Sequence, residues 1–114
     1  MELELFLNRL EQTPESIEFP DTVALINSLY EFVPTGFRND MLYNQPGQNS
    51  GSCKIFAFAR LHNLGVEATL ACFGAYYRAD VLRHPDNDNH HNIRQFMKTG
   101  WDGIEFDGVP LRAR

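Results

Sequence analysis

Apolar residues recur at every third or fourth position through five segments of the chain, a spacing that places them on one face of an α-helix. The third segment is apolar around most of its circumference, with Lys54 and Arg60 as its charged residues, so it is predicted to be the buried central helix. Prolines, glycines and asparagines that favour turns stand between the segments. The pattern predicts helices over residues 2–12, 21–33, 50–63, 66–77 and 89–99.

The fold class predicted from these segments is mainly α. Residues 1–114 are expected to form a single domain, an irregular bundle of about five helices. The stretch over residues 37–50 lacks helical periodicity and is predicted to be mainly turn and loop. A small β ribbon would join residues 37–43 to residues 104–109, where an Asp-Gly turn signal separates two short apolar runs.

Gly74 interrupts the fourth predicted helix. A glycine inside a helix costs about 1 kcal/mol relative to alanine, because it loses more backbone freedom on folding. A packing reason is therefore expected at this position. We predict that Gly74 allows another helix to approach closely.

Length and composition limit the class of protein. A chain of 114 residues suits one domain, and a net charge of −5 argues against nucleic acid or an anionic membrane surface as a main partner. No apolar run approaches the roughly 20 residues that span a bilayer. Two cysteines, Cys53 and Cys72, are too few for a disulfide framework, so both are expected as reduced thiols. We expect no cofactor, and a monomer or a weak homodimer.

Cys53 is the first candidate for chemistry. It stands at the predicted start of a helix with Lys54 beside it, and both the helix dipole and an adjacent cation favour a thiolate. A thiol-dependent enzyme would also need a downstream histidine as base, and the candidates are His62, His84, His90 and His91. The alternative is a small apolar residue at the start of a core helix, because free cysteine is among the most buried residue types.

A second candidate is a group of metal-ligand residue types within eight positions: His84, Asp86, Asp88, His90 and His91. Neighbouring residues on a helix point about 100° apart, so the two adjacent histidines do not easily share one ion. The spacing matches no zinc signature. The alternative to a metal site is a polar loop that caps the following helix.

The loop before the third predicted helix is a third candidate, with Asn49, Ser50, Gly51 and Ser52 as its site residues. Glycine-containing loops that lead into a helix can bind phosphate through free backbone N–H groups. The sequence lacks the Gly-Lys-Ser/Thr of a phosphate-binding P-loop. A loop that turns into a capped helix explains the same residues.

A fourth candidate is a surface for a protein partner. Tyr, Trp and Arg are enriched at interface hot spots. The chain places such residues near predicted helix ends, together with one carboxylate: Tyr76, Tyr77, Arg78, Trp101 and Asp102. The alternative is that these side chains belong to the core or its edge.

Several ordered strings identify a family resemblance. They are QPGQNSGSCKIFAFARL at residues 45–61, TLACFGAYY at 69–77, Asp80-Val81-Leu82, His84-Pro85, and NIRQFMKTGWDGI at 92–104. On these residues the chain resembles the HopJ type III effector family. The resemblance implies a small, single-domain bacterial protein, and it implies no catalytic residue or cofactor.

The leading interpretation is a non-enzymatic interaction or structural module of HopJ type, with an unknown protein partner that would be a host protein if the chain is exported. The alternatives are a small enzyme with Cys53 as nucleophile and a ligand- or metal-binding domain. Helical periodicity begins at Glu2 and no serine precedes Ser16, whereas type III export signals are serine-rich and disordered. We therefore expect the protein in the bacterial cytoplasm.

Overall fold

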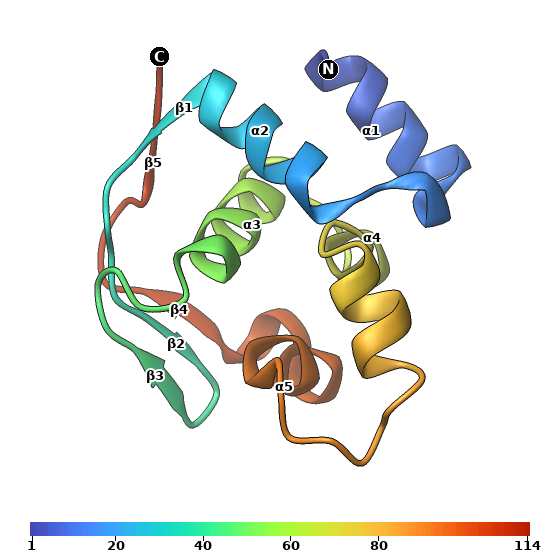
Figure 1. The fold of residues 1–114 in the computed structure, drawn as a ribbon. Coiled ribbons are helices and arrows are strands. Elements are labelled where there is room, and N and C mark those ends of the chain that lie inside the picture. The colour runs from blue at the N-terminus through green and yellow to red at the C-terminus, as the bar shows by residue number, and fades with distance from the viewer.

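The helices gather around α3, and the strands of two small antiparallel sheets lie together on one side of them (Figure 1). The computed structural model describes residues 1–114. Its α-helices are α1 (Leu3–Gln12), α2 (Phe19–Leu29), α3 (Ser50–Leu61), α4 (Val66–Ala71) and α5 (His91–Thr99). Its strands are β1 (Tyr30–Phe32), β2 (Phe37–Asn39), β3 (Leu42–Asn44), β4 (Ile104–Phe106) and β5 (Leu111–Ala113). Shorter helical segments are η1 (Pro14–Ser16), the π-helix η2 (Tyr76–Val81) and η3 (Gly100–Gly103).

The predicted mainly α class is wrong, because five strands form two sheets and the fold is α+β. One sheet has the order β3-β2-β4, and the other pairs β1 with β5. The expected ribbon is present, with Phe37 opposite Phe106 and Asn39 opposite Ile104. Every strand is three residues long, too short for alternation of apolar and polar residues to reveal it.

The second predicted helix ends earlier than expected. Helix α2 stops at Leu29, and Tyr30 turns to the extended conformation with φ −134° and ψ 148°. The next residues pair with the end of the chain, so that Tyr30 lies opposite Ala113 and Phe32 opposite Leu111. Pairing with the distant strand β5 thus makes residues 30–32 a strand, although local periodicity predicts a helix there.

The fourth predicted helix is divided at Gly74. This residue has φ +60°, and a Cβ atom there would lie 2.6 Å from the backbone nitrogen of Phe19. The predicted close approach is therefore confirmed, with the start of α2 as the neighbour. A positive φ is not helical, so the helix breaks at Gly74 and resumes as the π-helix η2. Glycine suits this position, because residues with a side chain rarely adopt this φ.

Helix α3 is the central element, as its apolar composition predicts. It lies in the middle of Figure 1, and its residues 55–59 are buried. Phe56 contacts four other rings at centroid distances of 4.9 to 6.4 Å: Phe37, Phe73, Phe96 and Trp101. These contacts join α3 to a sheet, to the end of α4 and to α5. None of the helices combines the length and apolar character needed to cross a bilayer.

Candidate functional site

The starts of α3 and α5 open on one cavity of about 340 Å³, which we call the α3–α5 pocket. Four separate segments of the chain contribute its walls. The lining residues are Phe19, Asn49, Gly51, Ser52, Phe73, Tyr76, His90, His91, Asn92 and Ile93. The pocket is thus built from the polar starts of two helices and from aromatic side chains of the segments beside them.

Both helices begin at this pocket with the same backbone conformation. Asn49 precedes α3 with φ +54°, and His90 precedes α5 with φ +53°. Neither side chain caps its helix. The first N–H groups of an α-helix have no acceptor within the helix, so both starts present free donors and a partial positive charge.

A network of asparagines fixes the two helix starts relative to each other. Asn92, in the first turn of α5, exchanges hydrogen bonds with Asn44 at the end of β3, with N–O distances of 2.9 and 3.2 Å. The amide nitrogen of Asn49 donates to Asn44 Oδ1 at 2.7 Å, and that of Asn39 donates to Asn92. Asn39 Oδ1 is buried without a partner. Buried polar networks of this kind specify one arrangement, because each broken bond leaves a desolvated group.

Aromatic rings form one wall of the pocket. Tyr76 packs on Phe19 at a centroid distance of 4.9 Å and on His90 at 5.0 Å. Phe19 also covers Gly51, where a Cβ atom would lie 2.8 Å from its ring. Glycine at this position therefore lets the ring sit directly over the first turn of α3.

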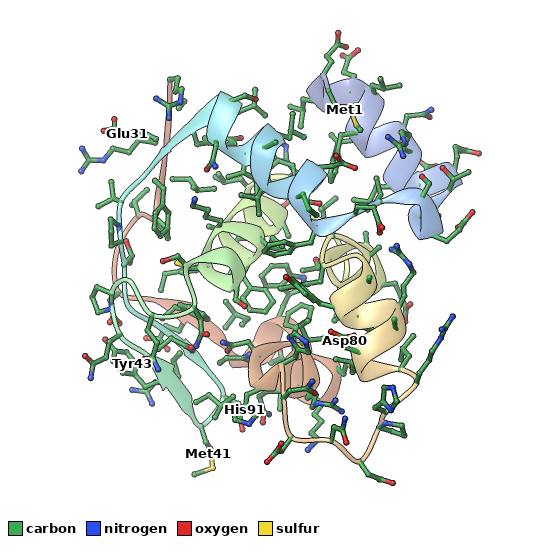
Figure 2. The ribbon with its side chains drawn as sticks, viewed as in Figure 1. Met1, Glu31, Met41, Tyr43, Asp80 and His91 are labelled. Atoms are coloured by element: carbon green, nitrogen blue, oxygen red, sulfur yellow. The ribbon has the colours of Figure 1, made fainter.

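A carboxylate on the neighbouring π-helix holds one of the two histidines. His90 Nε2 lies 3.0 Å from Asp80 Oδ2, and this pair joins the start of α5 to η2. Figure 2 labels Asp80 on η2 and His91 at the start of α5. The loop between the two elements is held by Arg94, which donates to the backbone oxygens of Pro85 and Asn89. His90 thus enters the pocket with its ring oriented from two sides.

Comparison with known proteins places this architecture in a family. The family model for the HopJ type III effector protein matches residues 3–111. The chain belongs to the HopJ family. A crystal structure titled as that of the unknown function protein VPA0580 is 54% identical, with a TM-score of 0.98, and the match covers 100% of this chain and 95% of that one. A search among curated proteins finds no match.

In this HopJ domain, residues from three of the four sequence-predicted sites meet at the α3–α5 pocket. Asn49, Gly51 and Ser52 come from the predicted loop site, and His90 and His91 come from the predicted metal segment. The aromatic candidate Tyr76 completes the group. Ser50 does not line the pocket, and its hydroxyl donates to the backbone oxygen of Gly47.

Cys53 faces the interior of the HopJ domain. Its side chain is fully buried, and its thiol lies 3.6 Å from the backbone oxygen of Thr35. Burial raises the pKa of the Cys53 thiol to about 11. Lys54 bonds to Asn27 Oδ1 at 3.0 Å, and His62 Nε2 lies 2.9 Å from the hydroxyl of Tyr30. These surroundings favour the interpretation as a core residue over that as a nucleophile.

The remaining metal candidates lie on the surface. His84, Asp86 and Asp88 are exposed in the loop between η2 and α5. No three histidine, cysteine or carboxylate side chains of the chain converge in a way that could hold a metal ion. These three residues form a polar loop, but the cap predicted for the following helix is missing, because no side chain caps α5.

The predicted partner surface is dispersed by the fold. Tyr76 lines the α3–α5 pocket, whereas Tyr77 and Arg78 line a second cavity beside α1. Trp101 packs against Phe56 and Phe96 and donates its indole N–H to the backbone oxygen of Leu64. The neighbouring Asp102 is exposed. The five residues do not share one cavity.

Sequence reasoning missed the residues that join the pocket's segments. Phe19 is distant in sequence from Gly51, which it covers, and Asp80 reaches His90 from the other side of the loop that joins η2 to α5. Asn92 gave a weak signal, because a polar residue stands there in the first turn of a helix whose other inward positions are apolar. Spatial convergence of loops has no local signature in a single sequence.

Proposed function

We propose that this HopJ-family domain is a non-catalytic binding module whose α3–α5 pocket takes a small anionic ligand. The observation that carries the proposal is that two helix starts, each without a side-chain cap, open on the same cavity. A helix start favours anions through its free N–H groups and its dipole. Two starts on one cavity add their effects.

The walls of the pocket support the same ligand class. No lysine, arginine or carboxylate lines it. The donors in its walls are backbone N–H groups, the hydroxyls of Ser52 and Tyr76, the amides of Asn49 and Asn92, and the two histidines. Its volume of about 340 Å³ is at the lower end of the range for small-molecule sites. A ligand with a carboxylate or phosphate group would place that group at the helix starts and an apolar part against the Tyr76 ring. It would thus contact both the hydrogen-bond donors and the aromatic wall of the pocket.

Backbone amide signals in nitrogen-15 NMR spectra test the proposal with inorganic phosphate, sulfate and citrate as probes. We expect the signals of Gly51, Ser52 and His91 to shift with saturation at millimolar anion. Ser52→Ala should weaken binding about tenfold, because it removes one hydrogen bond to a charged group. His84→Ala is the matched control, since His84 is exposed and outside the pocket. Equal weak shifts over the whole surface for all three anions would contradict the proposal.

The predicted protein partner and the bacterial cytoplasm as location stay part of this proposal. A secretion reporter fused to the N-terminal segment would test export directly. Retention of the reporter in the bacterium supports a cytoplasmic ligand, and type III-dependent export would instead place the ligand in the recipient cell.

A further inference from the structure

A second cavity, of about 410 Å³, lies between α1 with η1 on one side and α4 with η2 on the other. We call it the α1–α4 groove. Its floor is apolar and consists of Leu10, Pro14, Ala68 and Ala71, of which Leu10 and Ala71 are buried. An apolar floor open to solvent offers a place for an apolar side chain from outside the domain.

Three carboxylates stand around this floor, and each comes from a different element. Glu11 belongs to α1, Glu15 to η1 and Glu67 to α4, and all three are exposed. None of them takes part in an ion pair, because the two ion pairs of the chain are Arg78 with Glu18 and His90 with Asp80. The rim therefore keeps its negative charge.

The one cation in the groove is already engaged. Arg78 contacts Glu18 Oε1 with one nitrogen and donates to the backbone oxygen of Ile17 at 2.8 Å with the other. Glu18 lies outside the groove, so this ion pair neutralises Arg78 without using a rim carboxylate. Burial and, to a smaller extent, the charge of Glu67 raise the pKa of the Tyr77 hydroxyl. The Tyr77 hydroxyl forms no hydrogen bond with another side chain.

We propose that the α1–α4 groove docks a basic segment of a partner protein, in which lysine or arginine residues flank an apolar side chain. The apolar side chain would lie on Leu10 and Ala71, and the cations would face Glu11, Glu15 and Glu67. The argument is charge complementarity across an apolar floor, with a net charge of −5 on the whole chain to steer such a segment toward it. This inference is independent of the anion proposal, because the two cavities share no lining residue.

The test uses the full chain labelled with nitrogen-15 and a set of short synthetic peptides in which Leu, Ile or Phe stands between two lysines or two arginines. We expect at least one peptide to shift the amide signals of Leu10, Glu67, Ala68 and Tyr77 with saturation. Combined Glu11→Gln, Glu15→Gln and Glu67→Gln should weaken that peptide about tenfold or more, and added salt should weaken it further. Glu105→Gln is the matched control, because this exposed residue lies on β4, outside the groove.

Three outcomes would overturn the proposal. Absence of saturable shifts in the groove with every peptide at millimolar concentration excludes a basic segment. Equal affinity for a plain diamine makes the groove a small-cation site. Shifts at the groove on raising the concentration of the protein alone identify a second copy of the chain as the occupant. Loss of phosphate shifts at Gly51 and Ser52 bears only on the α3–α5 pocket.

Discussion

The π-helix η2 separates two cavities of opposite character. Tyr76 lines the α3–α5 pocket, where two helix starts provide hydrogen-bond donors, and Tyr77 lines the α1–α4 groove, where three carboxylates surround an apolar floor. These tyrosines are adjacent in sequence. Figure 1 shows their segment, η2, after α4 and beside α5. Sequence proximity suggested one surface, but successive helical residues point in different directions and serve different neighbours.

The largest effect is expected where both cavities depend on one residue. Gly74→Ala places a Cβ atom at φ +60°, 2.6 Å from the backbone of Phe19, just before η2. Strain and overpacking together should lower the free energy of unfolding by about 3 kcal/mol, measured by urea denaturation. Gly65→Ala is the control, because it meets open space at an ordinary φ, and it should cost less than about 1 kcal/mol. Equal losses in the two variants would show that η2 tolerates displacement.

The second prediction concerns the reactivity of Cys53 in α3, which shows whether its thiol is accessible from the α3–α5 pocket or buried in the core. Raising a thiol pKa from 9.0 to about 11 lowers its thiolate fraction about a hundredfold near neutral pH, so native Cys53 should alkylate far more slowly than a free thiol. The unfolded chain ionises at lower pH than the folded one, so this thiol's contribution to stability falls as pH rises from about 9 toward 11. Alkylation of a Cys72→Ser variant, followed by mass spectrometry, measures the rate. A rapid reaction would return Cys53 to the candidate site.

A third change should separate the two cavities. Asn92→Ala removes the centre of the asparagine network: Asn39 Nδ2 and both side-chain polar atoms of Asn44 each lose one hydrogen bond in the buried interior. We expect a loss of about 2 kcal/mol in unfolding free energy and weaker anion binding, with unchanged peptide binding in the groove. Asn87→Ala, in the exposed loop, is the control. Parallel loss of both binding activities in Asn92→Ala would mean that the cavities are coupled.

The smallest effect should come from the pair that orients His90. Asp80→Asn alters a partly exposed contact at 3.0 Å and should cost about 0.5 kcal/mol in unfolding free energy. Anion affinity should fall about twofold, because the His90 ring then loses the carboxylate that orients it. Asp86→Asn, a carboxylate of the neighbouring loop, should leave the affinity as it is, and NMR titration with phosphate compares the two. The same affinity in both variants would remove His90 from the ligand site.

Local patterns predicted the parts of the fold that rest on local physics. The apolar circumference of α3 identified the core helix, and Gly74 identified a close approach. Three-residue strands escaped prediction because their stability comes from partners far along the chain, as with Tyr30 and Ala113. The site shows the same division: Gly51 and His90 could be singled out individually, but their meeting depends on Asn44 and Phe19, which connect segments that no spacing rule relates.

The pairing of β1 with β5 constrains the order in which elements can fold during synthesis. The partner of Tyr30 is Ala113, and the backbone N–H of Arg114 bonds to Leu29. A nascent chain can form the helices from α1 to α4 before residues 111–113 have left the ribosome, but it cannot close this sheet until they have. Until then the edge of β1 has no partner strand, and its backbone N–H and C=O groups are exposed to other chains.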